Sequence, residues 1–310
     1  MAACPPPAAP GAKPATHPGT QPGTQPPVLV VPAPCKVNLH LGIHEGRDAR
    51  GYHRADSVMV PLALADTLTV REAPELRVCH EPALGVAPER TTVWRAAMLL
   101  AEALGVAPQV EVHVDVRIPE RAGLGGSSAD AGATLRALAG RWGVAPTDPR
   151  VVDVARRVGA DVAFFLDPAP ALMVGAGDVL AERFPALSLP VALVLPAAEG
   201  VGTREAYDEF DRAPEAPADP GPLCAALREG RADDVPGLLA NNLAPAARRL
   251  SPAVGEAEAW LQVQPGVLAA QVTGSGGCSF ALCESDAAAE AVAAGATARG
   301  WWSCATRTCG

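Results

Sequence analysis

The stretch Arg121-Ala-Gly-Leu-Gly-Gly-Ser-Ser-Ala-Asp-Ala-Gly-Ala-Thr-Leu-Arg-Ala-Leu138 begins with a glycine-rich turn and continues into a helical pattern. It follows residues 110–118, where valine and isoleucine alternate with polar residues as in a strand. Ser127 or Ser128 is placed to cap the helix after the turn. Glycines let the backbone approach a ligand closely, and the N-terminus of a helix attracts anions. The stretch therefore predicts a phosphate-binding loop, with an ordinary strand-to-helix connection as the alternative.

Two common nucleotide-binding motifs are excluded by the residues around this turn. No Lys-Ser or Lys-Thr pair follows the glycines, so the P-loop pattern is not matched. The glycine spacing, with no acidic residue at the end of a next strand, argues against a Rossmann dinucleotide site. The predicted phosphate loop is therefore of another kind.

The composition restricts the classes of protein and partner. The chain has 310 residues, enough for two domains, and its 49% hydrophobic and 19% charged residues are typical of a soluble globular protein. The net charge of −9 argues against a nucleic-acid partner. No apolar run is long enough for a membrane span, and the first residues do not resemble a signal peptide, so we expect a cytoplasmic protein. The eight cysteines form no Cys-x-x-Cys pair, which argues against a disulfide framework or a zinc site.

Lysine is rare in this chain. Of the 25 basic residues only Lys13 and Lys36 are lysine. Lys13 lies in residues 1–27, whose proline, alanine, glycine, threonine and glutamine composition predicts disorder. Lys36 and Asn38 lie on the polar face of a predicted half-buried strand. A lone lysine among arginines indicates a place that needs a compact ammonium group, with a surface lysine as the alternative.

Asp161 directly precedes an apolar and aromatic run over residues 162–166. One interpretation is that its carboxylate caps a helix. The other is that the carboxylate is held at the edge of the core, beside a reacting hydroxyl. The local sequence favours the cap.

The order of predicted elements indicates the fold class. Helices are predicted over residues 92–104 and 287–298, and strands over residues 57–70 and 191–195. Strands and helices do not alternate regularly, so the sequence predicts an α+β protein with two domains. We expect a disordered tail over residues 1–27, an N-terminal domain over residues 28–180 and a C-terminal domain over residues 181–310.

Four segments in chain order carry a resemblance to a known family. They are Pro34-Cys-Lys-Val-Asn-Leu39, Gly123-Leu-Gly-Gly-Ser-Ser-Ala-Asp130, Gly159-Ala-Asp-Val-Ala-Phe-Phe165 and Thr273-Gly-Ser-Gly-Gly277. Together they resemble the GHMP kinase superfamily, over roughly residues 28–283. The resemblance implies an ATP-binding N-terminal GHMP kinase domain and a ferredoxin-like C-terminal GHMP kinase domain, with ATP and substrate in the cleft between them. It also implies an ATP-dependent small-molecule kinase with an alcohol acceptor, using ATP as co-substrate and Mg²⁺.

The resemblance assigns roles to individual residues of this chain. Lys36 and Asp161 match the catalytic lysine and aspartate. The residues expected to bind the ATP phosphates are Gly123, Leu124, Gly125, Gly126, Ser127 and Ser128. The residues expected to bind the substrate are Asn38, Tyr52, His53, Thr203, Tyr207, Gly274, Ser275 and Gly276. No metal ligand is assigned, and the loop departs from the family pattern at Ser127, where a third glycine is usual.

Tyr52 and Tyr207 indicate the acceptor. They are the only tyrosines in the chain, and they match an aromatic pair that sandwiches a cytosine, with ordinary partial burial as the alternative. Within the family this implies a cytidine diphosphate-linked methylerythritol acceptor, phosphorylated on its 2-hydroxyl in non-mevalonate isoprenoid biosynthesis. The alternatives are another GHMP kinase acting on homoserine, mevalonate or a sugar, and a non-catalytic binding protein on the same fold. We expect a small-molecule substrate, no nucleic-acid or membrane partner, and a monomer or homodimer.

Overall fold

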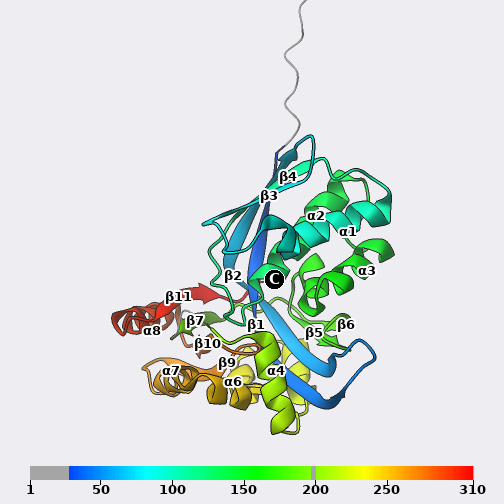
Figure 1. Cartoon of the computed structure of the whole chain (residues 1–310). Helices are drawn as coiled ribbons and strands as arrows, with labels where there is room; N and C mark the ends of the chain where they lie inside the picture. The colour runs from blue at the N-terminus through cyan, green and yellow to red at the C-terminus, as the bar shows by residue number, and fades with distance from the viewer. Residues whose placement is uncertain (1–27, 197–199, 310) are drawn as a thin grey trace, which may run out of the picture.

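The computed structural model describes residues 28–196 and 200–309. The predicted disorder of residues 1–27 concerns residues outside these ranges. The described residues form two β-sheets, each packed against helices (Figure 1). None of the described helices is both long and apolar enough to cross a lipid bilayer. The mixed architecture confirms the predicted α+β class.

The larger sheet has the strand order β3-β4-β2-β1-β8, and β5 extends it by pairing with β2 and with β6. Its strands are β1 (Leu29–Arg47), β2 (His53–Glu72), β3 (Arg77–Glu81), β4 (Val110–Asp115), β5 (Ala171–Val174), β6 (Val179–Arg183) and β8 (Ala240–Asn241). The long strands β1 and β2 pair antiparallel along most of their length. This hairpin is the centre of the sheet and carries Lys36.

Helices cover one face of the larger sheet (Figure 1). They are η1 (Pro88–Arg90), α1 (Thr92–Leu104), α2 (Gly126–Arg141), α3 (Pro149–Val158) and η2 (Ala160–Leu166). The predicted helix over residues 92–104 is confirmed as α1. The Thr91 hydroxyl accepts the Trp94 N–H at 3.2 Å, and Gly105 ends the helix with a φ of 67°. Buried alanines, valines and leucines of α1, α2 and α3 pack against β2 and β4 in one core.

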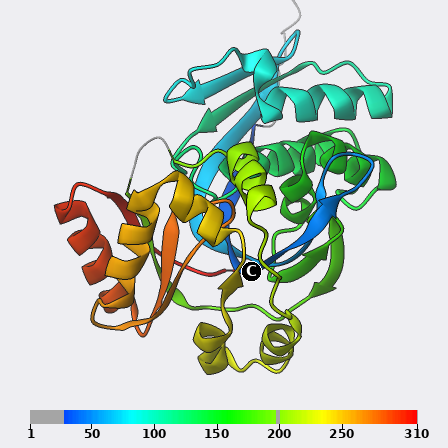
Figure 2. The same cartoon turned by 60° about the horizontal axis from the view of Figure 1, so that its bottom comes forward.

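The smaller sheet has the strand order β11-β7-β10-β9, and all neighbours are antiparallel. Its strands are β7 (Pro190–Leu195), β9 (Val267–Val272), β10 (Ser279–Cys283) and β11 (Trp302–Arg307). Two helices, α7 (Pro252–Gln262) and α8 (Asp286–Ala298), lie side by side on one face of it (Figure 2). The two sheets meet where Leu62 of β2 bridges Thr308, just after β11.

The segment between β7 and α7 contains α4 (Thr203–Arg212), α5 (Gly221–Arg228), η3 (Ala232–Leu238), β8 and α6 (Ala244–Leu250). The sequence predicts a loop over residues 213–222 and helices over residues 223–263, but β8 runs parallel to β1 and returns the chain to the larger sheet. Because two residues make too short a strand for a periodic pattern, only the tertiary pairing reveals it. The domain boundary near residue 180 stays a prediction.

The expectation that β1 is half-buried is wrong. Its apolar face is buried, and so is its polar face, where Lys36 is 3%, Asn38 1% and His40 1% exposed. The glycine turn before α2 and the turn over residues 273–277 cover this polar face, as shown by contacts of Lys36 with Gly123 and of Asn38 with Thr273. Segments distant in sequence therefore enclose the polar face of β1.

Candidate active site

One cavity of about 710 Å³ gathers the predicted site residues. Its walls come from β1, β2, the glycine turn before α2, the start of η2, α4 and the second glycine turn. Except for Gly276, all of the residues predicted to catalyse or to bind line this cavity, namely Lys36, Asn38, Tyr52, His53, Gly123, Leu124, Gly125, Gly126, Ser127, Ser128, Asp161, Thr203, Tyr207, Gly274 and Ser275. The structure thus brings together residues from segments that are far apart in sequence.

Lys36 lies at the closed side of the cavity. Its ammonium donates hydrogen bonds to Asn38 Oδ1 at 2.7 Å and to the Gly123 carbonyl at 2.8 Å. Its backbone N–H donates to the Leu124 carbonyl at 2.9 Å, which joins β1 to the glycine turn. Burial lowers the pKa of Lys36, and the nearby Asp161 carboxylate acts in the opposite direction. A buried, oriented ammonium next to the glycine turn can stabilise negative charge on a phosphoryl group.

A hydrogen-bond network holds Asn38 in place. Asn38 Nδ2 donates to Ser57 Oγ at 2.8 Å, and the Thr273 hydroxyl donates to Asn38 Oδ1 at 3.3 Å. The same Oδ1 accepts from Lys36, so Asn38 orients the ammonium. A contact of Asn38 with substrate stays a prediction. Sequence reasoning missed Ser57, because no local pattern distinguishes it from an ordinary strand residue, and it included Thr273 only as the first residue of a motif, without this role.

Asp161 faces Lys36 rather than capping a helix. Its Oδ2 is 3.7 Å from Lys36 Nζ, and its side chain is 32% exposed toward the cavity. Asp161 lies inside the first turn of η2, and Gly159 is the N-cap, without a side-chain cap. The cap interpretation from the local sequence is therefore wrong. Pairing with a buried ammonium explains the orientation, because such a pair is worth more than one exposed capping hydrogen bond.

The glycine turn leads directly into α2. Gly125 is the N-cap with a φ of 74°, and no side chain caps the helix. The expectation that Ser127 or Ser128 caps it is wrong, because the helix already begins at Gly126 and both serines lie in its first turn. The Ser128 and Ala129 N–H groups donate to the Gly125 carbonyl at 3.0 and 2.8 Å. The N–H groups of Gly126 and Ser127 precede them at the start of α2, where a helix offers no acceptor, so they are available to an anion in the cavity.

The two glycine turns touch each other through their backbones. A Cβ atom on Gly123 would lie 2.3 Å from the Thr273 carbonyl oxygen, and one on Gly274 would lie 2.9 Å from the Gly123 carbonyl oxygen. Both glycines have positive φ, 74° and 56°. No other residue type fits this contact without strain.

Gly123→Ala is expected to lower the free energy of unfolding by about 2–4 kcal/mol, because the methyl group overlaps the Thr273 carbonyl and the positive φ disfavours alanine. Gly140→Ala is the matched control, since that helical glycine has open space around it and the change should stabilise α2 by up to about 1 kcal/mol. Denaturant unfolding of both variants measures the difference. Equal stability of the two variants would contradict the close contact.

The predicted base-binding residues lie at the mouth of the cavity. Tyr52 is 48% exposed, and the Arg50 guanidinium lies 5.5 Å from its ring centre. Tyr207 is half-buried and stacks on His53, with ring centres 5.5 Å apart and an interplanar angle of 29°. Burial raises the pKa of Tyr207, so its phenol stays protonated. His53 Nδ1 donates to the His44 carbonyl at 2.9 Å, and its Nε2 is 3.0 Å from Asp211. His53 is therefore fixed by its contacts and packs against one face of the Tyr207 ring.

Thr203 and Ser275 connect α4 to the second glycine turn, with their hydroxyl oxygens 3.2 Å apart. Gly276 belongs to the same turn but does not line the cavity. Its N–H donates to the Thr273 carbonyl at 3.1 Å, and a Cβ on it would lie 2.5 Å from the Ala247 side chain. Gly276 thus shapes the turn in this structure, and its contact with substrate stays a prediction.

Further residues of the cavity were not predicted from the sequence. They are Ser57, Asp66, Arg47, Arg121, Arg204 and Asp130, the last quoted only as part of a motif. All but two of the 25 basic residues are arginine, so no spacing distinguishes the arginines of the cavity from those of the surface. The two aspartates come from β2 and α2 and meet only in the folded chain.

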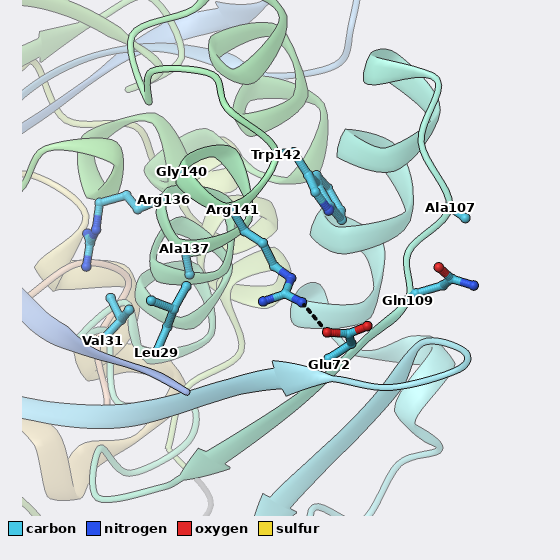
Figure 3. Close-up of a pocket in the computed structure, with 10 residues that line it drawn as sticks. All are labelled: Leu29, Val31, Glu72, Ala107, Gln109, Arg136, Ala137, Gly140, Arg141 and Trp142. Atoms are coloured by element: carbon cyan, nitrogen blue, oxygen red, sulfur yellow. Dashed lines mark hydrogen bonds and ion pairs between the residues drawn. The ribbon is translucent and has the colours of Figure 1, made fainter. Parts of the chain in front are cut away.

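A second cavity, of about 680 Å³, lies elsewhere on the larger sheet (Figure 3). It is bordered by the start of β1 and the end of α2, where Arg141 reaches Glu72 at 3.5 Å and Trp142 forms a wall. None of the residues predicted to catalyse or to bind lines it. We therefore place the candidate active site in the first cavity.

Among the described residues, no group of three or more histidine, cysteine, aspartate or glutamate side chains is arranged to hold a metal ion. Mg²⁺ in kinase sites is held largely by substrate phosphates and water, with few protein carboxylates.

Comparisons with known proteins identify the family of this chain. Family models match residues 91–169 (GHMP kinases N terminal domain) and residues 223–300 (GHMP kinases C terminal). The chain is 36% identical over 283 residues to the 4-diphosphocytidyl-2-C-methyl-D-erythritol kinase of Parvibaculum lavamentivorans, covering 87% of this chain and 94% of the relative. It is 37% identical over 288 residues to the enzyme of that name from Mycobacterium tuberculosis, covering 90% of this chain and 88% of the relative.

Solved structures give the same result. A 4-(cytidine 5'-diphospho)-2C-methyl-D-erythritol kinase superposes with a TM-score of 0.75 at 30% identity, covering 91% of this chain and all of that one. The homoserine kinase from Cytophaga hutchinsonii superposes with a TM-score of 0.69 at 19% identity, covering 94% of this chain and 97% of that one, and so shares the fold. The identity to curated relatives extends along nearly the whole chain, and the chain therefore belongs to the 4-diphosphocytidyl-2-C-methyl-D-erythritol kinase family within the GHMP kinases.

Proposed function

We propose that this chain transfers the γ-phosphoryl group of ATP to the 2-hydroxyl of 4-diphosphocytidyl-2-C-methyl-D-erythritol, a step of non-mevalonate isoprenoid precursor synthesis. One observation carries the proposal. The buried Lys36 ammonium lies 3.7 Å from Asp161 in a cavity that also contains the two glycine turns and both tyrosines. A kinase for an alcohol with a cytidine headgroup needs each of these parts.

Phosphoryl transfer depends on positioning and on charge stabilisation. The 2-hydroxyl oxygen forms a bond to the γ-phosphorus while the bond from that phosphorus to the β–γ bridging oxygen breaks, and ADP leaves. Asp161 accepts the proton of the hydroxyl, and it is the carboxylate of η2 that faces the cavity. Lys36 and the N-terminal N–H groups of α2 stabilise the negative charge of the phosphates.

ATP is the co-substrate, and we propose that Mg²⁺ arrives bound to its phosphates. The ion would neutralise charge on the β- and γ-phosphate oxygens. The residues that face these oxygens are those of the glycine turn, Gly123–Ser128, whose backbone shapes the cavity wall. Lys36 contacts the same turn through the Gly123 carbonyl.

The cytidine headgroup is proposed to lie at the mouth of the cavity, against the Tyr52 and Tyr207 rings. Tyr207 stacks on His53, which restricts the orientation of its ring. Tyr52 is exposed and available to stack. Homoserine and mevalonate have no base, so this aromatic wall favours the cytidyl acceptor over them.

Tyr52→Ala is expected to raise KM for the cytidyl acceptor about 5- to 150-fold, because stacking of a base on one aromatic ring is worth about 1–3 kcal/mol. The KM for ATP should not change. Tyr52→Phe is the matched control, since it keeps the ring, and its KM should stay close to that of the wild type. Steady-state kinetics with each substrate varied in turn measures both constants. An unchanged acceptor KM in Tyr52→Ala would contradict the role of Tyr52.

The function itself is tested by a coupled ADP-release assay with purified protein, Mg²⁺ and ATP. The acceptors to compare are 4-diphosphocytidyl-2-C-methyl-D-erythritol, homoserine and mevalonate. We expect turnover with the cytidyl acceptor alone. Turnover with another acceptor and not with this one would refute the proposal.

The domain division at residues 28–180 and 181–310 is part of the proposal, as is a cytoplasmic enzyme that works as a monomer or homodimer. The larger sheet contains all strands through β6, and the smaller sheet begins with β7, which supports a boundary in this region. Light scattering on the purified chain distinguishes the two oligomeric states.

A further inference from the structure

Two aspartates meet beside the phosphate loop. Asp66 lies on β2 and is 1% exposed, and Asp130 lies in the second turn of α2 and is 6% exposed. Both carboxyl groups line the active-site cavity, and they lie close enough that the negative charge of Asp66 raises the pKa of Asp130. Two buried carboxylates in contact cannot both be ionised at modest cost, so the pair must hold a proton.

The surroundings of the two carboxyl groups decide which one is protonated. Asp66 Oδ1 accepts the backbone N–H groups of Arg117 at 2.5 Å and of Ile118 at 2.8 Å. Asp130 Oδ1 is buried and has no hydrogen-bond partner among the described residues. Donors stabilise a carboxylate, and a buried group without donors favours the neutral form. Asp66 is therefore the carboxylate, and Asp130 is the acid.

We propose that Asp130 is a neutral carboxylic acid that donates its proton to the Asp66 carboxylate, and that this shared proton positions the phosphate loop and keeps a second negative charge away from ATP. The inference rests on the proposed function in one respect, that ATP occupies this cavity. Asp66 and Asp130 act as positioning residues, and neither takes part in the transfer step.

The pair holds both ends of the loop. Asp66 binds the backbone at Arg117 and Ile118, which precede the loop, and Asp130 lies on the helix that follows it. Loss of the shared proton would put two negative charges side by side in a buried place. These charges would repel each other and the ATP phosphates, so the loop would lose its alignment and its affinity for the anion.

The acid–base properties agree with this assignment. Burial and the neighbouring Asp66 raise the pKa of Asp130 to about 8. The folded protein then holds a proton that the unfolded chain releases near pH 4. The free energy of unfolding therefore falls as pH rises from about 4 to about 8, and is lowest above that range. Other charged or titratable groups near the pair are Asp115, Arg117 and Cys35, while His80, Lys36 and Asp161 line the same cavity.

Asp130→Asn tests whether ionisation of Asp130 weakens ATP binding, because the amide keeps the shape and the hydrogen-bond donor of the neutral acid but cannot ionise. In the wild type we expect KM for ATP to rise at least about fivefold between pH 7 and pH 9.5, as Asp130 loses its proton. In Asp130→Asn this rise should be absent. Asp66→Asn is the complementary variant. Its amide donates to Asp130 and favours the Asp130 carboxylate, so the pair carries a single negative charge at every pH and the rise of KM for ATP above pH 7 should be absent here too.

Two measurements do not require catalysis, so their results distinguish a failure of this inference from a failure of the proposed function. The dissociation constant of a non-hydrolysable ATP analogue, measured by calorimetry across the same pH range, should follow the KM. Infrared difference spectra of the wild type between about pH 6 and pH 9.5 should show the carbonyl band of a buried protonated carboxyl that disappears at high pH. This spectrum requires no variant to fold.

Three results would overturn the inference. One is the absence of that carbonyl band at the lower pH. Another is the same pH dependence of ATP-analogue binding in the wild type and in folded Asp130→Asn. The last is a strongly increased Mg²⁺ requirement in Asp130→Asn, since that would make Asp130 a carboxylate ligand of the metal instead of a neutral acid.

Discussion

Asp161→Asn is expected to lower kcat by about 10²- to 10⁴-fold, because the amide can accept a hydrogen bond from the 2-hydroxyl but cannot take its proton. Asp161 is the partly exposed carboxylate that faces Lys36 in the cavity. The KM for ATP should change little, since the glycine turn and α2, and not Asp161, are the proposed contacts of the phosphates. The ADP-release assay measures kcat, and calorimetry measures ATP binding.

Asp167→Asn is the matched control. Asp167 follows η2, six residues after Asp161 in the chain, but its side chain is 68% exposed and pairs with Arg183 at 2.9 Å. An exposed ion pair contributes little to stability, so this variant should keep its turnover. If Asp161→Asn kept kcat within about tenfold of Asp167→Asn, Asp161 would not be the proton acceptor.

Lys36→Arg is expected to lower kcat by at least about 10²-fold although it keeps the positive charge. The ammonium is 3% exposed, and it already contacts Asn38 and the Gly123 carbonyl. The space beside it is occupied, since a Cβ on Gly274 would lie 3.2 Å from Nζ and one on Gly125 would lie 3.2 Å from Cε. A planar guanidinium does not fit there without moving a glycine turn.

Lys36→Met is the companion variant, because it keeps most of the shape and removes the charge. It leaves the Gly123 carbonyl without its buried side-chain donor, which costs about 1–3 kcal/mol, and Asn38 Oδ1 keeps only the Thr273 hydroxyl as a donor. We expect an equal or larger loss of kcat than in Lys36→Arg, in protein shown to be folded by circular dichroism. Turnover close to the wild type in Lys36→Met would mean that the positive charge is not required.

The two pH effects at this site are separable. Burial lowers the pKa of Lys36, so the protonated form that supports turnover is lost at a lower pH than for an exposed lysine, and kcat should fall on the alkaline side. The Asp130 effect acts on KM for ATP and is absent in Asp130→Asn. A fall of kcat at high pH that persists in Asp130→Asn therefore belongs to Lys36 or another group, and not to the carboxyl pair.

Local sequence patterns predicted the elements that depend on near neighbours. The helix α1, with Thr91 as its cap and Gly105 at its end, is found over the predicted residues. Strand β4, the glycine turn at Gly123 and helix α2 follow one another in the chain, as the alternating apolar residues and the glycines predict. The single lysine of the predicted folded part indicated a special ammonium, and the structure buries it in the cavity.

Local sequence patterns gave the wrong prediction for polar side chains that can either cap a helix or line a binding site. Asp161 and the serines of the loop look like caps, because capping residues are the same polar types that line binding sites. Asp161 faces the Lys36 ammonium instead of capping η2. Helix α2 begins at Gly126 because Gly125, with its positive φ, is the N-cap, so the serines lie inside the helix. Neither can be read from residues nearby in the chain.

The sequence by itself determined the main elements, the α+β class and the four motifs that carry the resemblance. Only the tertiary structure decided the contact of Lys36 with Asp161, the backbone contact between the two glycine turns and the pairing of Asp66 with Asp130. The physical reason is that helix and strand patterns reflect interactions over a few residues. Hydrogen bonds and charges within a cavity depend instead on how elements from both sheets pack together.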